Sequence, residues 1–225
     1  HQGEGIKTII YGGGPMYVSD IKAALAVMGP RFVQIYGQGE SPMTISVLSR
    51  QIIADRQHPR WEERLASVGT AQSCVDLRVV DEQMRDCAPG VAGEIVVRGP
   101  SVMRGYWRNE AATRETIVDG WLRTGDIGYL NEDGFLTMTD RIKDVIISGG
   151  TNIYPREVEE VLARHEAVAE VSVVGEPDAE WGEIVVAFVV PRAPGAVDAS
   201  ELDHWCRAHM ASFKKPKKYI FCTEL

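Results

Sequence analysis

The chain has 225 residues, and its 24 basic and 32 acidic side chains give a formal net charge of −8. This length suffices for one large domain or two small ones with a buried core. Hydrophobic residues at 44% and charged residues at 25% are typical of globular proteins, which argues against wholesale disorder, collagen-like repetition and a coiled coil. The acidic balance also argues against a general nucleic-acid binder, because counterion release requires a basic face.

The sequence also indicates a compartment. No apolar run approaches the roughly 20 residues that span a bilayer, and the N-terminus lacks the apolar core of a signal peptide. The cysteines are scattered without a C-x-x-C pair, which is typical of reduced thiols; they are Cys74, Cys87, Cys206 and Cys222. We therefore expect a soluble cytoplasmic protein with no integral membrane segment.

The first 60 residues predict an α/β piece. An apolar strand at 8–11 runs into three glycines, and a helix with Ser19 as its N-cap follows. A second strand at 32–36 then leads into the turn at 37–40. If these elements form a βαβ unit, both glycine-rich turns lie at the carboxyl ends of parallel neighbouring strands, where open α/β sheets bind ligands.

The predicted secondary structure changes twice along the rest of the chain. Residues 61–139 predict a small antiparallel barrel or sheet, with strands at 75–80, 94–97 and 135–138 between turns. Residues 140–225 predict a compact α+β domain, with strands at 145–147, 168–174 and 184–190, a helix beginning at Pro155, and a helix whose capping box opens at Ser200.

Four features carry candidate chemistry, and each alone is better explained by a turn or a solvated surface. The glycines at 12–14 could let a flat or phosphorylated ligand approach the backbone, and Glu40 could bind Mg²⁺ through a carboxylate oxygen. Asp126, after a glycine turn, could accept hydrogen bonds from a ribose diol. The charged cluster at 140–144 is either a solvated linker or a hinge.

Taken together, these features form an ordered set of motifs. The set comprises Gly12-Gly13-Gly14-Pro15, Tyr36-Gly37-Gln38-Gly39-Glu40, Gly93-Glu94-Ile95 with Gly105-Tyr106, Leu122-Arg123-Thr124-Gly125-Asp126, and Asp140-Arg141-Ile142-Lys143-Asp144 through Ser148-Gly149-Gly150-Thr151-Asn152-Ile153-Tyr154-Pro155. It resembles the adenylate-forming superfamily of acyl-CoA synthetases, peptide-synthetase adenylation domains and beetle luciferases. The resemblance covers nearly the whole chain. It implies that residues 1–139 are the C-terminal portion of a large AMP-binding domain, and that 140–225 are the small mobile C-terminal domain, incomplete at its end.

The resemblance also implies a role for each motif. Residues of the ATP/AMP site are expected to be Gly12, Gly13, Gly14, Tyr36, Gly37, Asp126 and Arg141. Glu40 resembles the Mg²⁺ ligand, and Gly37 with Gln38 is expected near the acyl pocket. Lys143 falls at the hinge position, and Ser148, Gly149 and Gly150 resemble the loop that lines the CoA channel.

The chain departs from the family pattern in three places. Gly39 stands where the family usually has a threonine that contacts the α-phosphate. The Ser/Thr/Gly-rich phosphate loop, expected well upstream of Gly12, is missing. The segment 213–219 resembles the one before the family's closing Gly-Lys motif, whose adenylation lysine is expected beyond Leu225; its four lysines are interpreted as a solvated basic surface.

The resemblance favours part of an ATP-dependent carboxylate–CoA ligase, an acyl- or aryl-CoA synthetase of the kind that serves fatty acid metabolism. Its substrates are expected to be ATP with Mg²⁺, CoA and a small carboxylic acid that the sequence does not identify. We expect the chain by itself to be inactive or nearly so. The alternatives are a non-catalytic module that retains nucleotide or CoA binding, and an adenylation domain that serves a carrier protein. An exposed parallel sheet edge near the N-terminus would also permit a homodimer.

A metal site in the last helix is disfavoured. His204, Cys206 and His209 lie close in sequence but point in different directions around one helix, and the pattern indicates that His209 continues the apolar stripe.

Overall fold

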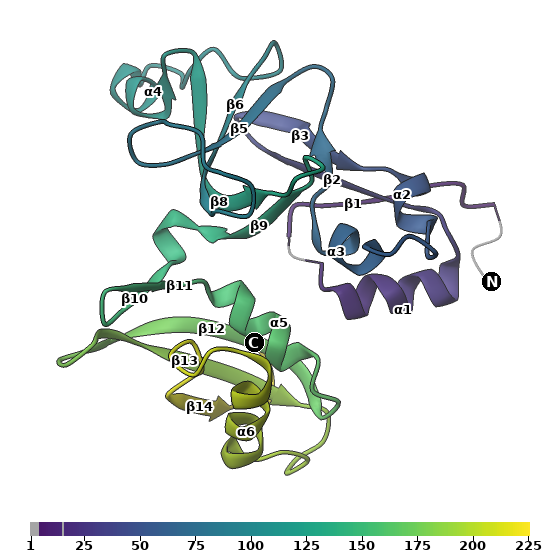
Figure 1. Ribbon diagram of the computed structural model, residues 1–225, viewed down its shortest axis with the longest axis vertical. Coiled ribbons are helices and arrows are strands. Elements are labelled where there is room, and N and C mark those ends of the chain that lie inside the picture. Colours follow the sequence, from purple (N-terminus) through teal and green to yellow (C-terminus); the bar gives the residue numbers. More distant parts are fainter. Residues whose placement is uncertain (1–4, 15) are drawn as a thin grey trace. The chain divides into compact units, whose positions relative to one another are not determined.

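The computed structural model describes residues 5–14 and 16–225. Pro15, which closes the first glycine motif, lies outside the described residues. The chain divides into two compact units after Met138, and each is described by itself below (Figure 1). The sequence places this division one residue later.

The first unit begins with the predicted βαβ arrangement. Strand β1 (Ile9–Tyr11) pairs in parallel with β2 (Phe32–Gln38), and helix α1 (Val18–Met28) connects them. The sheet continues through antiparallel β3 (Ser41–Leu48) and β4 (Thr70–Ala71), which the sequence did not indicate. The predicted N-cap was wrong, because Ser19 lies inside α1 and Tyr17 precedes it without a side-chain cap.

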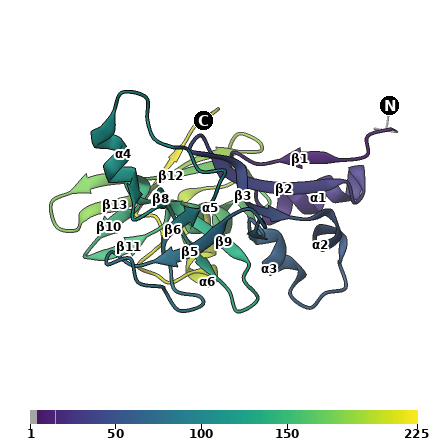
Figure 2. The ribbon, with the colours of Figure 1, turned by 90° about the horizontal axis from the view of Figure 1, so that it is seen from above.

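Three helices pack against this sheet. Helices α1, α2 (Arg50–Ala54) and α3 (Trp61–Ala66) share one apolar core with β2 and β3, and both views place α1 and α3 on the same side of β1 (Figures 1 and 2). The core residues are Ile21, Leu25, Phe32, Leu48, Ile53, Leu65 and Phe135. Burial of these side chains holds the carboxyl ends of β1 and β2 in place beside one another.

The second sheet of this unit confirms the predicted antiparallel β-rich segment. Its path is β5 (Asp76–Val80), β6 (Gly93–Arg98), β8 (Trp121–Leu130) and β7 (Ile117–Val118), with β9 (Leu136–Arg141) pairing to β8 and helix α4 (Glu110–Thr116) before β7. The sequence missed β8 because Gly125 and Gly128 interrupt its apolar pattern and indicate turns.

The two sheets of the first unit are joined by backbone and by core. The Val68 amide donates to the carbonyl of Leu136 at 2.7 Å, and the Leu136 amide donates to the carbonyl of Gly69 at 2.8 Å. A second core cluster contains Tyr36 and Ile45 from the first sheet and Ile95 from the second. Because this cluster is continuous, the end of β2 lies against β6 and β8, and this contact positions the candidate site.

The second unit is an α+β sandwich of one sheet and two helices. The sheet order is β11 (Thr151–Ile153), β10 (Ile146–Ser148), β13 (Gly182–Pro191) and β12 (Val168–Asp178), with β14 (Lys218–Phe221) pairing in parallel to β13. Helices α5 (Pro155–Ala163) and α6 (Ala199–His209) pack on the same core, which includes Val158, Leu162, Leu202 and Cys206. The α+β prediction is confirmed.

Helix α6 corrects one detail of the sequence analysis. The expected capping box at Ser200 does not form, since Asp198 is the N-cap and its carboxylate accepts from the Glu201 amide at 2.9 Å. Among the described residues, no helix is long and apolar enough to cross a bilayer.

Candidate functional site

The first glycine motif lies directly beside β2. Tyr11 pairs in register with Gln34, so Gly12 faces the backbone of Ile35. A Cβ at position 12 would lie 2.3 Å from the Ile35 carbonyl oxygen, so only glycine fits there. Gly13 has φ +80° and, like its two glycine neighbours, is exposed. The predicted adenine-pocket glycines are therefore an open turn at the carboxyl end of β1, one residue away from Tyr36 on the neighbouring strand.

Asp126 comes to the same place from the second sheet. Its carboxylate accepts a hydrogen bond of 2.6 Å from the Tyr36 hydroxyl, and the side chains of both residues are buried, with Asp126 only 4% exposed. A buried carboxylate requires donors of this kind, because its desolvation is costly when it is unpaired. Two predicted site residues that are 90 positions apart in sequence are thus in direct contact.

The turn that presents Asp126 is built by its neighbours. The Thr124 hydroxyl donates to the Ile95 carbonyl at 2.7 Å and accepts from the Asp126 amide at 3.1 Å. Gly125 has φ +71°, a conformation that favours glycine. The Thr-Gly-Asp tripeptide is therefore a defined bend within strand β8, and it supports the interpretation of Asp126 as an oriented acceptor.

Glu94 stabilises this bend by accepting hydrogen bonds from Arg123 and from the Gly125 amide, a role that sequence reasoning missed. One Glu94 oxygen accepts from both Arg123 Nε and Nη2, at 2.8 and 2.5 Å, and the other faces the Gly125 amide at 3.3 Å. The Glu94 side chain is 10% exposed. The motif Gly93-Glu94-Ile95 was part of the resemblance, but only the fold reveals that its carboxylate holds the Asp126 turn.

Gly37 and Gln38 complete the end of β2. A Cβ at Gly37 would lie 2.3 Å from the Met43 amide nitrogen, so glycine is required for the chain to turn back tightly into β3. The Gln38 amide nitrogen lies 3.4 Å from the Thr124 carbonyl and donates to it. The predicted acyl-pocket residues therefore belong to the same cluster as Tyr36 and Asp126.

Glu40 lies in the turn between β2 and β3 and is held from two sides. Its carboxylate oxygen Oε1 accepts from the Tyr106 hydroxyl at 2.6 Å, and its backbone carbonyl accepts from the Met103 amide at 2.7 Å. The carboxylate raises the pKa of the Tyr106 phenol, because their hydrogen bond favours the protonated form. Sequence reasoning gave Tyr106 no role, and only its place in the Gly105-Tyr106 motif signalled it.

The surroundings of Glu40 fit a magnesium ion that is shared between the protein and a phosphate group. No group of three or more His, Cys, Asp or Glu side chains suited to a metal occurs among the described residues. Mg²⁺ is commonly held by one or two carboxylates together with phosphate oxygens and waters. Glu40 is half-buried, and in the part of the chain that the structure describes only one of its carboxylate oxygens has a hydrogen-bond partner. Such a carboxylate fits a shared site, and it does not fit a cation held by protein alone.

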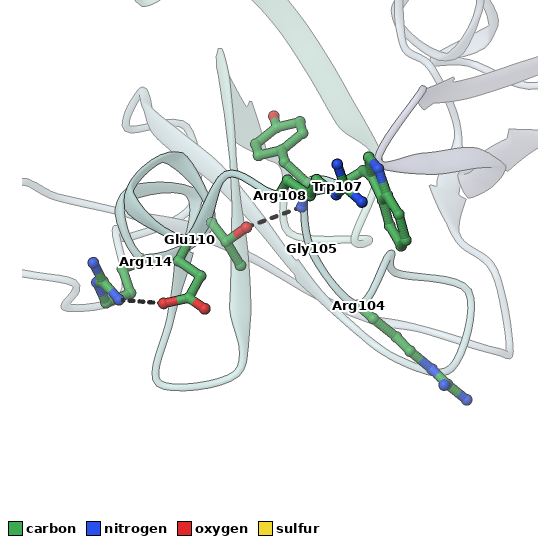
Figure 3. Close-up of a pocket in the computed structure, with 8 residues that line it drawn as sticks. Arg104, Gly105, Trp107, Arg108, Glu110 and Arg114 are labelled. Carbon is green, nitrogen blue, oxygen red and sulfur yellow. Dashed lines mark hydrogen bonds and ion pairs between the residues drawn. The ribbon is translucent and has the colours of Figure 1, made fainter.

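A shallow pocket of about 430 Å³ adjoins Tyr106. Figure 3 shows Glu110 and Arg114, which pair at 3.4 Å, on one side of it, with Arg104 and Trp107 on the other. Trp107 is 86% exposed. The pocket is an open surface lined by arginines and by two aromatic residues, Tyr106 and Trp107, and it belongs to the segment that contacts Glu40.

The charged cluster at 140–144 belongs to the second unit. The Asp140 carboxylate accepts from the Arg141 amide at 2.8 Å and from the Arg156 amide at 3.2 Å, and burial raises the pKa of Asp140. Arg141 is exposed, as is Lys143, which lies in a single 3₁₀ turn (Ile142–Asp144). The cluster is therefore not a solvated linker throughout, since its first residue is attached to the start of α5.

The predicted CoA loop is the hairpin between β10 and β11. Gly149 and Gly150 have φ of +57° and +77°, and the Gly149 amide donates to the Trp181 carbonyl at 2.8 Å. A Cβ at Gly149 would lie 2.9 Å from the Trp181 ring. Both backbone conformation and space therefore require glycine at position 149.

The lysines near the C-terminus form the expected solvated surface only in part. Lys217 and Lys218 are exposed, whereas Lys214 and Lys215 are half-buried. Lys214 pairs with Glu157 at 2.7 Å, Lys215 pairs with Asp203, and Lys218 pairs with Glu176 at 2.9 Å. The Lys217 ammonium lies 3.8 Å from the Trp181 ring centroid. The acidic partners come from other parts of the sequence, which is why the charge run alone did not reveal them.

The residues of the disfavoured metal site separate around α6. Cys206 is fully buried, as core packing requires, but His204 and His209 are both exposed. His209 stacks on Trp205 with ring centroids 3.9 Å apart. The expectation that His209 continues the apolar stripe was wrong.

Comparison with known proteins identifies similar families and structures. A family model for AMP-binding enzymes matches residues 1–107, and one for the C-terminal domain of AMP-binding enzymes matches residues 157–225. A 2-succinylbenzoate–CoA ligase of Bacillus cereus is 43% identical over 220 residues, which cover 98% of this chain and 43% of that ligase.

Solved structures agree with these matches. Amide bond synthetase McbA from Marinactinospora thermotolerans has a TM-score of 0.89 at 36% identity, covering 97% of this chain and 43% of that one. o-Succinylbenzoate CoA synthetase from Bacillus subtilis, solved with ATP and a magnesium ion, has a TM-score of 0.84 at 37% identity, covering 99% and 44%. The chain thus spans less than half the length of these relatives.

The Tyr36–Asp126 hydrogen bond generates a stability prediction. Tyr36→Phe removes the donor from a buried carboxylate, so we expect the free energy of unfolding of the first unit to fall by about 1–3 kcal/mol. Urea denaturation measures this change. The matched control is Tyr129→Phe on the same strand as Asp126, whose hydroxyl has no hydrogen bond to any described residue. Equal stability of the two variants would contradict the prediction.

Proposed function

The chain belongs to the family of AMP-binding, adenylate-forming enzymes, and on this premise we propose that it supplies nucleotide-binding and thioester-forming parts of an ATP-dependent carboxylate–CoA ligase. In this reaction a carboxylate oxygen attacks the α-phosphorus of ATP and pyrophosphate leaves. The CoA thiol then attacks the carbonyl of the acyl-adenylate, AMP leaves, and an acyl-CoA thioester forms.

The observation that carries the proposal is the Tyr36–Asp126 pair beside the Gly12 turn. We assign the adenine to the open glycines at 12–14 and Tyr36, and the ribose hydroxyls to Asp126. A carboxylate oriented by the Tyr36 hydroxyl and by a shaped turn is preorganised, so it accepts the ribose diol without reorganising. Arg141 is proposed to assist at the same nucleotide from the second unit.

Glu40 is proposed to hold Mg²⁺ together with phosphate oxygens of ATP. The ion, when bound, neutralises charge that develops on the phosphates. The contribution of the chain itself is the Glu40 carboxylate, on a residue whose backbone carbonyl accepts from the Met103 amide. Gly39, where relatives of this family usually carry threonine, offers the α-phosphate only a backbone amide.

The thioester step is assigned to the second unit. We propose that Lys143 marks the hinge about which this unit turns between the two half-reactions, and that Ser148, Gly149 and Gly150 then line the CoA channel. The hairpin supports this assignment, because its glycines have positive φ and a side chain at Gly149 would press on Trp181. Gly37 and Gln38 are proposed to border the acyl group.

The similarity to an amide bond synthetase favours one alternative, in which an amine rather than CoA accepts the acyl group. A carrier protein as acceptor, and a module that binds nucleotide without catalysis, also stay open. The cytoplasmic location and the homodimer stay predictions.

An acceptor assay on the complete product of the gene tests the proposal. Aryl, arylpropenoic and fatty acids are each supplied with ATP, Mg²⁺ and either CoA or an amine. We expect acid-dependent release of pyrophosphate and a thioester with CoA, because the chain contains the hairpin that we assign to CoA. Amide formation without any thioester would favour the alternative. No pyrophosphate with any acid would contradict the proposal.

The ribose assignment makes its own prediction for this chain. Loss of a charged hydrogen-bond acceptor costs binding energy equivalent to about 10- to 100-fold in affinity, so we expect Asp126→Asn to weaken AMP binding by that factor in calorimetry. AMP without its ribose hydroxyls, 2′,3′-dideoxy-AMP, should bind the unchanged chain with a similar loss. Asp119→Asn, in the exposed turn before β8, is the control. Equal affinity of the unchanged chain for both nucleotides would refute the assignment.

The CoA-loop assignment predicts a separation of the half-reactions. Gly149→Ala should slow thioester formation by about tenfold or more while pyrophosphate exchange stays near its original rate, because strain of the order of 1–3 kcal/mol arises only in that hairpin. Gly195→Ala is the control, since Gly195 also has positive φ, at +74°, but open space around it. Equal slowing of both half-reactions, or of both variants, would contradict the assignment.

A further inference from the structure

Tyr106 contacts Glu40 in a way that the proposed reaction does not explain. The phenol donates a short hydrogen bond of 2.6 Å to Oε1 of Glu40, across 66 residues of sequence. Tyr106 is 37% exposed, so its ring is not simply a core residue with a satisfied hydroxyl. An exposed tyrosine gains little by reaching a carboxylate that water could solvate. The contact therefore points to a role at the carboxylate.

The segment that carries Tyr106 is itself anchored at both ends. Met103 donates its amide to the backbone carbonyl of Glu40, so the segment holds this one residue at its main chain and at its side chain. On the other side, the Tyr106 amide donates to the Thr113 hydroxyl at 2.9 Å, and that hydroxyl donates to the Asn109 carbonyl at 2.8 Å. The main chain of Tyr106 is thus fixed to the N-terminal part of α4.

The hydrogen bond between Tyr106 and Glu40 has a defined direction. A carboxylate oxygen can only accept, so the phenol donates its proton to Oε1 of Glu40. Within residues 5–14 and 16–225, no hydrogen-bond donor contacts Oε2 of Glu40, and this oxygen is open to another positive partner.

From this geometry we propose that Tyr106 is a positioning residue that orients the Glu40 carboxylate toward a divalent cation bound with nucleotide. The inference rests on the proposed function, in which Glu40 holds that cation. Two effects of the hydrogen bond oppose one another. It withdraws electron density from Oε1, which weakens the carboxylate as a ligand, and it removes rotamer freedom that a glutamate would otherwise lose on binding. Partners of this kind usually strengthen metal binding by about 10- to 100-fold, so ordering is expected to dominate.

The test measures how strongly the cation and the nucleotide assist one another in this chain. Calorimetry gives the affinity for ATP in the presence of Mg²⁺ and in the presence of EDTA. The ratio of these two affinities measures how much the cation strengthens ATP binding. We expect Tyr106→Phe to lower this ratio by about tenfold. Its affinity for AMP in EDTA and its melting temperature should stay unchanged. Glu40→Gln should also lower the ratio, and the double variant should lose little more, because both substitutions act on one interaction.

Two further variants keep the inference falsifiable. Tyr129→Phe, a phenol of the same unit without such a contact, should leave the ratio unchanged. Thr113→Val keeps the phenol but removes the partner of the Tyr106 amide, and we expect a loss of about threefold. An unchanged ratio in Tyr106→Phe, with AMP binding intact, would overturn the inference alone. A chain that binds no AMP at all would overturn the proposed function and this inference with it.

Discussion

The buried hydrogen bond between Tyr36 and Asp126 is the interaction on which the rest of the first unit's site depends. It joins the last residues of a parallel strand pair to a bend in an antiparallel strand from another sheet. A carboxylate with so little exposure is stable as an ion only if donors reach it, so the two sheets cannot separate there without stranding a charge. Stability and a fixed acceptor for a ligand thus arise from the same contact.

Close backbone approach is the second constraint. At Gly12 and at Gly37, an added Cβ atom would lie 2.3 Å from a backbone atom of a neighbouring strand. These positions bring main-chain groups to the surface of the site, where they can contact a flat ring or a phosphate without an intervening side chain. The site is therefore made largely of backbone, with a few oriented carboxylates, and sequence motifs rich in glycine are its natural signature.

Periodicity and turn residues in the sequence indicated the βαβ start, the β-rich segment and the final α+β unit, because each of these is encoded locally. Strand β8 was missed, since its glycines form a bend whose purpose is visible only against Glu94 and Ile95. For the site, resemblance named Asp126 and Glu40, while Tyr106 and Glu94 gained roles only from contacts across 66 and 31 residues. Pairing over such distances leaves no local pattern, and for the same reason the sequence did not reveal the ion pairs of Lys214 and Lys215.

The attachment of Asp140 to the amide of Arg156 bears on the pivot of the domain rotation that we propose. Asp140 precedes Lys143 in sequence, and its carboxylate accepts a hydrogen bond from the first turn of α5. A swivel about Lys143 would pull the carboxylate away from α5 and expose that helix end, whereas a swivel before Asp140 would leave the bond intact. The hydrogen bond is therefore broken by one of these rotations and kept by the other. Exchange of the Arg156 amide proton with solvent would show which of the two takes place.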